Sequence, residues 1–558
     1  MRGMMMETPL LITSIMRHAE QLHGDREIVS VTGDNPRHRY DYASAFRRAR
    51  QLANALRRLD VAQGDRLGTL AWSDHRHFEV YYAVACYGAV CHTINPRLFE
   101  AQLEYIIDHA ADRYLFVDPD YLPLIEKLAP RLTGLRGVIV LTTRACIPQS
   151  ASAGSLGAKL LCYEELLAAE SDQFDWPALD EQTASSLCYT SGTTGLPKGV
   201  LYSHRSNVLH TLCSSSPDVL GLRNTDTVMP IVPMFHANAW GIPYSAAMAG
   251  AKLVLPGAKL GDAATLAELI ETEGIDVAFG VPTVWTTLLQ FLQIQNRRLT
   301  KLRRVYVGGS ACSLALLQQL RDRHGVTAHH AWGMTETSPV GTVNSLTATR
   351  ANLATADQEA EQLLQGRAVF GVELKIVDDA NRAQPWDGIA TGMLKVRGPF
   401  VCADYFQPPE QDSGSSQGKS PGSSSHDSDG WFSTGDMAAI TPNGHLRIAD
   451  RIKDVIKSGG EWISSIDLEN AAMSFPGIAE AAVIAVAHPK WQERPLLLVV
   501  AQAGRVIDKA ALLAMLSTKV AKWWIPDDVV VVSELPHTAS GKIDKLQLRK
   551  KFADHQLV

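Results

Sequence analysis

The chain has 558 residues, of which 46% are hydrophobic and 20% are charged, and its formal net charge is −6. This length exceeds what one hydrophobic core supports, so it predicts several domains. The composition is that of an ordinary globular enzyme, and the negative net charge excludes the basic footprint of a nucleic-acid partner.

Helix-like and strand-like segments alternate from about residue 46 to residue 317. The segments with this rhythm are QLANALRRLD (51–60), LFV (115–117), GVIVLTT (137–143), AATLAELIETEG (263–274), DVAFG (276–280) and RRVYVGGSACSLALLQQL (303–320). The alternation predicts an α/β fold of layered, mostly parallel sheets with helices. Ligands of such folds bind where loops leave the carboxyl ends of the strands.

The segment YTSGTTGLPKGV (189–200) follows the strand-like ASSLCY and combines glycines, hydroxyls and one lysine. Glycines let backbone N–H groups approach a ligand, hydroxyls donate hydrogen bonds, and Lys198 supplies positive charge. Together they predict a phosphate-binding loop. It is not a Walker A loop, because Pro197 stands where that motif needs its second glycine and Gly199 follows the lysine.

Two further segments offer nucleotide contacts. In AWGMTET (331–337), Thr335 brings a hydroxyl and Glu336 a carboxylate suited to Mg²⁺, unless this is only a solvated turn. In WFSTGDMA (431–438), Asp436 follows a glycine in an expected turn. It either accepts hydrogen bonds from ribose hydroxyls or caps the next element.

Two other segments point toward the reacting groups. In PMFHANAW (233–240), His236 and Trp240 stand in a small, apolar stretch. A lone histidine there is more often packed than an acid or base, so we expect His236 to contact substrate or nucleotide without transferring a proton. In PHTASGKIDK (536–545), Lys542 lies at the tip of a Ser/Gly loop between a strand and a basic helix, where it is either solvated or delivered to a partner surface.

The C-terminal part differs in character from the rest. Residues 410–429, rich in Ser, Gly and Asp, predict a disordered insertion. Its GSSQG matches the nucleophile elbow of hydrolases only formally, since the required strand and helix are missing. After RIADRIKDVIKSGGEWIS (447–464), strands at 480–487, 495–502 and 527–535 and a helix at 511–524 predict a small α+β domain.

Location and redox state follow from simple patterns. The N-terminal MRGMMMETPLLITS lacks the continuous apolar run of a signal peptide, and no segment is long enough to span a membrane. Eight cysteines without C-x-x-C spacing predict reduced, mostly buried thiols. We therefore expect a cytoplasmic protein. The sequence leaves peripheral membrane contact and a homodimer open.

Five motifs in one order, YTSGTTGLPKGV, AWGMTET, STGD, ADRIKDVIKSGGEWIS and PHTASGKIDK, resemble the adenylate-forming superfamily. This superfamily contains acyl-CoA synthetases, carrier-protein adenylation domains and firefly luciferase. HANAW with DRIKDVIKSGGEWIS is most similar to the fatty-acyl-CoA synthetase branch, medium-chain ligases included. The resemblance covers nearly the whole chain. It implies a large AMP-binding domain at 1–450 and a small mobile domain at 453–558, which carries Lys542.

The resemblance implies an AMP-forming acid–thiol ligase that uses ATP, Mg²⁺ and coenzyme A on a small-molecule carboxylic acid. The acid first displaces pyrophosphate from ATP to form an acyl-adenylate. The thiol of coenzyme A then displaces AMP, after the small domain has swung about a hinge at Lys453.

Roles also follow from the resemblance, residue by residue. The residues implied to hold the phosphates are Thr190, Ser191, Gly192, Thr193, Thr194, Gly195, Lys198 and Thr335, with Thr190 and Glu336 at Mg²⁺. Those implied around adenine and ribose are Gly308, Gly309, Ser310, Ala331, Trp332, Gly333, Asp436 and Arg451. Ala331 departs from the glycine that many relatives have.

The remaining implied roles concern the acid and the mobile domain. Lys542 would bridge the carboxylate and the phosphate during adenylation, in a catalytic centre with Glu336, Thr190 and His236. Lys457 and Trp462 would contact the nucleotide in one domain orientation, and Gly459, Gly460 and Glu461 would line the pantetheine tunnel in the other. Trp240, Gly280 and Val281 would meet the acid, with Trp240 as gate, floor or simple packing.

The apolar segments NAWGIPYSAAMAG and AFGVPTVWTTLLQFL favour a hydrophobic acid over an amino acid, which would need a buried carboxylate to pair its ammonium. We therefore expect a medium- to long-chain fatty acid. A short or methylthio-substituted acid of the 3-methylmercaptopropionate type is the alternative, if Trp240 closes the tunnel. A luciferase-like monooxygenase and a non-catalytic nucleotide binder are less favoured.

Overall fold

The computed structural model describes residues 1–148, 160–190, 196–407, 426–458, 461–502, 504–538, 542–553 and 555. Some predictions lie outside these residues. They concern Ser191, Gly192, Thr193, Thr194, Gly195, Gly459, Gly460, the side chains of Glu461 and Trp462, and most of the expected insertion at 410–429.

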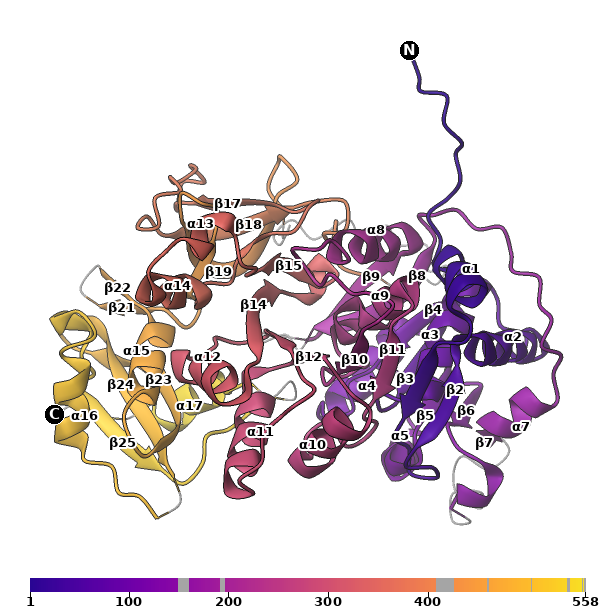
Figure 1. Cartoon of the computed structure of the whole chain (residues 1–558), viewed down its shortest axis with the longest axis horizontal. Coiled ribbons are helices and arrows are strands. Elements are labelled where there is room, and N and C mark those ends of the chain that lie inside the picture. Colours follow the sequence, from indigo (N-terminus) through magenta and orange to yellow (C-terminus); the bar gives the residue numbers. More distant parts are fainter. Residues whose placement is uncertain are drawn as a thin grey trace.

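Two large sheets, mostly parallel, form the body of the molecule (Figure 1). The nine-stranded sheet has the order β16 (Arg367–Ala368), β15 (Val340–Val343), β14 (Thr327–Gly333), β13 (Arg304–Val307), β12 (Val277–Gly280), β10 (Thr227–Pro230), β11 (Lys252–Leu255), β1 (Glu27–Ser30) and β2 (His38–Asp41). The seven-stranded sheet has the order β7 (Leu160–Cys162), β6 (Gly137–Val140), β5 (Asp112–Val117), β3 (Arg66–Leu70), β4 (Val90–Thr93), β8 (Ala184–Thr190) and β9 (Lys198–Ser203).

Two smaller sheets follow in the chain. The four-stranded sheet is antiparallel, with the order β17 (Glu373–Val377), β18 (Gly392–Arg397), β19 (Phe432–Ile440) and β20 (Leu446–Arg451). The five-stranded sheet contains β22 (Glu461–Ile463), β21 (Ile456–Ser458), β24 (Gln492–Ala501), β23 (Ile478–His488) and β25 (Asp528–Val532). In Figure 1 this last sheet, in yellow, stands at the end of the molecule opposite α2 and α7.

Helices cover the sheets and separate the two large ones. Those of the body are α1 (Ile12–His23), α2 (Tyr42–Arg58), α3 (His75–Tyr87), α4 (Glu100–Ala110), α5 (Leu122–Leu128), α7 (Tyr163–Ala168), α8 (His204–Ser214), α9 (Ile242–Ala249), α10 (Ala263–Thr272), α11 (Pro282–Ile294), α12 (Leu314–Gln318), α13 (Ala348–Ala351) and α14 (Thr355–Gln362). Those that pack with the five-stranded sheet are α15 (Ser465–Met473), α16 (Lys509–Leu516) and α17 (Lys545–Lys551).

The central helix α3 shows why the layers form. Asp74 accepts a hydrogen bond from the backbone N–H of His77 and so caps the start of the helix, and Gly88 ends it at a φ of 92°. Nearly every side chain in between is buried, because α3 contacts β1 in one large sheet and β4 and β8 in the other. The predicted α/β class of layered, mostly parallel sheets is therefore confirmed.

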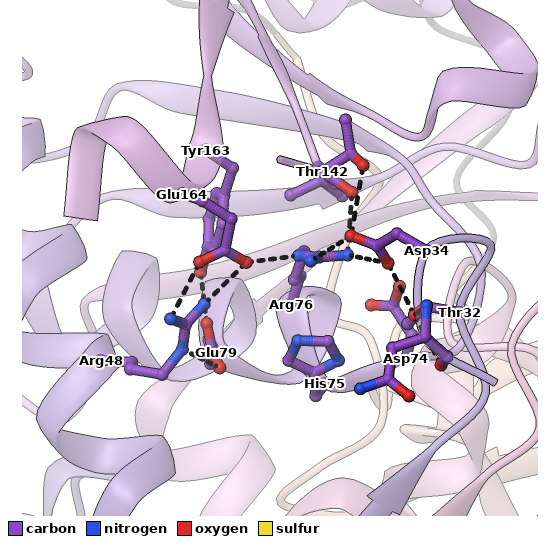
Figure 2. Close-up of polar contacts among 12 residues, drawn as sticks. Thr32, Asp34, Arg48, Asp74, His75, Arg76, Glu79, Thr142, Tyr163 and Glu164 are labelled. Atoms are coloured by element: carbon purple, nitrogen blue, oxygen red, sulfur yellow. Dashed lines mark hydrogen bonds and ion pairs between the residues drawn. The ribbon is translucent and has the colours of Figure 1, made fainter. Parts of the chain in front are cut away.

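A buried ion-pair network ties α3 to the elements around it (Figure 2). The guanidinium of Arg76 reaches Asp34 at 2.8 Å and Glu164 at 2.7 Å, and Arg48 joins Glu164 to Glu79. Burial works to raise the pKa of Asp34, but the hydrogen bonds and charge of Arg76 hold it at about 2. The network thus connects α2, α3, α7 and the loop after β1, and we assign it a role in the stability of the fold.

Three local expectations need correction. The helix expected at 511–524 ends at Leu516, because the hydroxyls of Ser517 and Thr518 bond back to the carbonyls of Ala514 and Met515; only residues 522–524 resume a 3₁₀ turn. Asp436 lies in strand β19, not in a turn. The disordered insertion was expected to reach residue 429, but residues 426–429 have defined contacts: His426 forms an isolated bridge with Phe432, and Asp427 forms ion pairs with Lys375 and Lys395.

Within the described residues, no helix combines the length and apolarity needed to cross a bilayer. The eight cysteines are free, and five of them are buried, namely Cys86, Cys91, Cys162, Cys188 and Cys312. Burial raises the pKa of the Cys312 thiol to about 12, which keeps it protonated and unreactive at neutral pH.

Candidate active site

The two strands that hold the expected phosphate loop form a hairpin. β8 and β9 are antiparallel, and Thr190 pairs directly with Lys198 across the residues between them. The hydroxyl of Tyr189 lies 2.7 Å from Nδ1 of His109 in α4, and this contact holds the C-terminal end of β8 against that helix. A Cβ on Gly199 would lie 3.1 Å from Leu187 and Phe406, so glycine lets this hairpin pack closely. Thr190 and Lys198 therefore stand at the two ends of the loop.

Glu336 is a buried carboxylate near this hairpin. It lies in a short 3₁₀ turn after β14 and is 5% exposed. Burial raises its pKa, against the hydrogen bond that the Tyr405 hydroxyl donates to Oε1 at 2.7 Å. The ammonium of Lys198 lies 4.8 Å from the centre of the same Tyr405 ring. Tyr405 thus connects the phosphate-loop lysine with the expected metal ligand.

Asp436 is held by two partners at once. Nε of Arg451, directly opposite in β20, lies 2.9 Å from one carboxylate oxygen, and the indole N–H of Trp332 donates to the other at 3.0 Å. The carboxylate is 2% exposed. The Trp332 ring lies against Gly341, where a Cβ would come within 2.6 Å of it. Three residues predicted around adenine and ribose are thus in direct contact.

Glycines and small residues form the wall beside this cluster. A Cβ on Gly308 would lie 3.0 Å from both the Ala331 carbonyl and the Trp240 ring, and one on Gly309 would lie 3.2 Å from Val281. The carbonyl of Gly280 accepts the indole N–H of the buried Trp285 at 3.2 Å. The expected adenine-side loop and the expected acid-side residues therefore share one wall, and Trp240 packs on it.

Gly333, Ser310 and Thr335, which the resemblance implies near the nucleotide, differ in exposure. A Cβ on Gly333 would come within 1.8 Å of the Pro339 carbonyl, so only glycine is accommodated. Gly309 and Ser310 are exposed beyond the end of β13. Thr335 is buried, and its carbonyl accepts the hydroxyl of Tyr202 at 2.7 Å. These contacts fix the backbone that leads to Glu336.

Lys542 reaches this site from the C-terminal part of the chain. It lies just before α17 and pairs with Thr538: the backbone N–H of Thr538 donates to the carbonyl of Lys542 at 2.6 Å, and the backbone N–H of Lys542 donates to the Thr538 hydroxyl at 3.2 Å. Desolvation by the surrounding protein lowers its pKa to about 8, although the residue keeps an exposed surface. The groups that interact with its charge are Arg451, Asp436, Lys453, Glu336 and His236.

His236 is neutral in this arrangement. Desolvation, together with the charge of Lys542, lowers its pKa to about 4. A neutral imidazole can donate or accept a hydrogen bond without adding charge. The contact of His236 with substrate or nucleotide stays a prediction.

Two further residues with predicted roles, the nucleotide contact Lys457 and the hinge residue Lys453, follow β20 in the chain. Lys457 is in the β21–β22 hairpin, where its backbone N–H donates to Glu493 at 2.8 Å, and its side chain is exposed. Lys453 is exposed in the turn after β20, and desolvation lowers its pKa. Lys453 lies on the segment that joins the four-stranded sheet to the five-stranded sheet, and Lys457 lies in the first strand that follows it.

Sequence reasoning missed Tyr405 and Tyr202. Tyr202 donates to the carbonyl of Thr335 and Tyr405 to the carboxylate of Glu336. Tyr202 follows the glycine-rich motif by two residues and looks like an ordinary strand residue there, and Tyr405 lies five residues before the Ser-rich stretch, in a segment without a motif. The contact of Tyr405 with Lys198 of β9 shows that it is part of the site.

Comparisons with known proteins agree with this geometry. Residues 16–406 match the AMP-binding enzyme family, and residues 467–542 match the AMP-binding enzyme C-terminal domain. The chain is 48% identical to 3-methylmercaptopropionyl-CoA ligase of Ruegeria lacuscaerulensis, over 99% of each chain. It is 47% identical to medium-chain-fatty-acid–CoA ligase of Ectopseudomonas oleovorans, over 99% of this chain and 98% of the relative.

A solved structure gives the same fold. The crystal structure of the anthranilate CoA ligase AuaEII in complex with anthranoyl-AMP has a TM-score of 0.83 and 24% sequence identity, over 98% of each chain. The nucleotide site and the layered fold define an adenylate-forming enzyme. The chain belongs to the AMP-binding enzyme family. The predicted class, an AMP-forming acid–thiol ligase that uses ATP, Mg²⁺ and coenzyme A, is confirmed.

Proposed function

We propose that this protein ligates a fatty acid of medium to long chain to coenzyme A through an acyl-adenylate. The observation that carries the choice of acid is the lack of charge around the expected acyl site. Residues 237–250 and 277–294 contain no Asp, Glu, Lys or Arg, and they include α9 and α11. An apolar tail is accommodated there without the buried ion pair that an amino acid would require.

In the first step, the acid's carboxylate attacks the α-phosphorus of ATP and pyrophosphate leaves. The barrier comes from bringing two anions together, so fixed positive charge is the main contribution of the protein. Lys542 would bridge the carboxylate and the phosphate, since it already lies near Glu336 and His236. No nucleophilic side chain is needed, because the substrate supplies the nucleophile.

The remaining cluster would hold the nucleotide. Asp436 would accept the ribose hydroxyls with Arg451 and Trp332 as its supports, and Lys198 would neutralise the outer phosphates. The neutral His236 would donate to a carboxylate or phosphate oxygen. This assignment rests on contacts of 2.9 Å and 3.0 Å at Asp436 and on the motif order.

The donors present fit a magnesium ion. Glu336 is a buried carboxylate whose pKa is raised by desolvation, so a divalent cation beside it would favour its ionised form. Thr190 would supply a second oxygen, and Mg²⁺ commonly takes one or two protein oxygens together with phosphates. When bound, the ion would offset the charge of the phosphates.

For the second step, we propose that the part beyond Lys453 turns as one unit. Lys453 is an exposed link between two sheets, which suits a hinge. In the turned orientation Gly459, Gly460 and Glu461 would line the pantetheine path, and Lys457 and Trp462 would leave the nucleotide. The thiol then attacks the carbonyl carbon and AMP leaves.

A ligase for short or methylthio-substituted acids is the second candidate. The specific observation in its favour is Trp240, whose ring packs on Gly308 and would shorten the acyl path. The similarity to 3-methylmercaptopropionyl-CoA ligases of two Ruegeria species, at 48% and 47% identity, supports it as well. A cytoplasmic location and a homodimer stay predictions.

The deciding experiment is CoA-dependent AMP release over saturated acids from butyrate to palmitate, with 3-methylmercaptopropionate as a matched short acid. We expect the highest kcat/KM for an acid of eight or more carbons, an order-of-magnitude expectation of about tenfold over butyrate. A maximum at 3-methylmercaptopropionate would favour the second candidate. Light or oxygen consumption would indicate a luciferase-like reaction, and acid-independent binding without turnover would indicate a nucleotide binder.

A further inference from the structure

The segment between His236 and α9 has an unusual backbone. Ala237, Asn238, Ala239 and Trp240 have φ angles of 45°, 49°, 48° and 58°, and Gly241 follows at 75°. L-residues disfavour this left-handed region, and consecutive ones are rare outside glycine. Something in the surrounding structure must therefore hold the turn.

Asn238 is the residue of this turn whose side chain forms hydrogen bonds with neighbouring elements. It is buried, at 4% exposure, and tolerates the left-handed region better than the neighbouring alanines do. Its Oδ1 accepts from the Thr93 hydroxyl at 3.3 Å, and its Nδ2 donates to the Ser186 hydroxyl at 3.4 Å. The Tyr81 hydroxyl lies 3.4 Å from Oδ1 and donates its proton to the carbonyl of Met234, in the segment that leads into the turn. These partners come from β4, α3 and β8.

Strand β8 touches the turn a second time. The Cys188 thiol interacts by hydrogen bonding with Thr93 and with the backbone of Ala237. Two residues further on, β8 ends at Thr190, where the expected phosphate loop begins. The turn that presents His236 and Trp240 is thus joined to the strand that leads to the phosphates.

On the other side, Gly241 leaves room for His210. A Cβ at Gly241 would lie 3.0 Å from that imidazole, whose Nε2 accepts the backbone N–H of Val340 at 3.2 Å. The turn is therefore held between α8, through the packing of His210 on Gly241, and β8, through the contact of Ser186 with Asn238. Among the residues that the structure describes, the side-chain hydrogen bonds of residues 237–240 are those that Asn238 makes with Thr93 and Ser186.

We infer that Asn238 is a positioning residue that holds this left-handed turn and thereby aligns the acid site with the phosphate-binding strand. It acts through Trp240, whose ring packs on the wall at Gly308, and through His236. The inference rests on the proposed function, since it assumes that an acid binds beside Trp240. Loss of the Asn238 contacts lets the turn relax and changes which acids are accepted.

The test is acid-dependent exchange of labelled pyrophosphate into ATP, with octanoate and with butyrate, for the full-length protein. The ratio of kcat/KM for the two acids does not depend on how much enzyme is active. We expect Asn238→Gly, which keeps the backbone freedom but removes the side chain, to change that ratio by about fivefold or more. Asn238→Asp keeps the acceptor oxygen and should restore the ratio in part.

The matched control is Asn296→Gly. Asn296 has the same φ of 49° but lies exposed after α11, away from the site. We expect its ratio to stay within about twofold of the wild type. If Asn238→Gly does not fold, Thr93→Val and Ser186→Ala each remove one partner and should move the ratio in the same direction by a smaller factor.

Two outcomes are kept apart. A ratio within about twofold of the wild type in every soluble Asn238 variant, with only a lower melting temperature, would make Asn238 a packing residue and overturn the inference. Absence of exchange in the wild type with any acid would instead count against the proposed function and leave no ratio to compare.

Discussion

Replacing Lys542 by alanine should impair the first half-reaction far more than the second. The lysine reaches Asp436, Glu336 and His236 from a separate part of the chain, and it is the cation expected to bridge carboxylate and phosphate. Its removal leaves the nucleotide cluster and the 2.9 Å contact between Arg451 and Asp436 in place. The variant should therefore still bind ATP, while the rate of adenylation falls.

The size of the effect follows from charge at the reacting centre. Losing one preorganised donor to developing charge typically lowers kcat by about 10²- to 10³-fold, so we expect that loss in pyrophosphate exchange at pH 7. With a pKa of about 8, Lys542 is roughly 90% protonated at pH 7 and roughly 10% at pH 9. Wild-type kcat/KM for exchange should thus fall about tenfold over this interval as the proton is lost.

The assays separate the two halves. Exchange of labelled pyrophosphate reports adenylation, and thioester formation from supplied acyl-adenylate reports the second step. Lys542→Ala should lose exchange and its pH dependence above pH 7, and should keep thioester formation within about threefold. Lys542→Arg should keep its charge to higher pH and move the alkaline limb. Equal losses in both halves would refute the bridging role.

Further predictions concern other parts of the site and fold. Tyr405→Phe removes the hydrogen bond that favours ionised Glu336, so the Mg²⁺ concentration for half-maximal exchange should rise about fivefold; an unchanged requirement would contradict this. Trp240→Ala should shift the preferred acid toward longer chains in AMP release, whereas an unchanged profile with lower stability would indicate simple packing. Arg76→Met leaves the largely buried carboxylate of Asp34 without its ion pair and leaves Glu164 with Arg48 alone, so urea unfolding should show a loss of about 3 kcal/mol in the free energy of unfolding with unaltered KM values; an unaltered midpoint would contradict the stabilising role of the network.

Much of the fold was readable from periodicity. The helix pattern at 263–274 became α10, and the strand, glycine turn and helix at 303–320 became β13 and α12. Local signals were sufficient there because caps such as Asp262 and Ser313 lie beside the apolar runs. The predicted C-terminal end of α16 was wrong. The pattern of apolar residues does not show that the hydroxyls of Ser517 and Thr518 bond to preceding carbonyls.

The sequence predicted the residues of the site that stand in motifs, but not the contacts between distant segments. Gly308, Glu336 and Lys542 stand in segments whose composition indicates phosphate or nucleotide chemistry. The contact of Trp332 with Asp436 joins residues 104 positions apart and depends on how two sheets meet. The left-handed turn around Asn238 was not predicted, because residues 237–240 contain no glycine to indicate positive φ angles. Long-range packing decided these features.

The most direct measurement is the incorporation of labelled pyrophosphate into ATP by purified protein with Mg²⁺ and without coenzyme A. The account predicts incorporation that requires an acid, occurs with octanoate or 3-methylmercaptopropionate, and falls about 10²- to 10³-fold in Lys542→Ala. Incorporation that is absent with 3-methylmercaptopropionate and with every acid from butyrate to palmitate, or that proceeds equally without any acid, would contradict it.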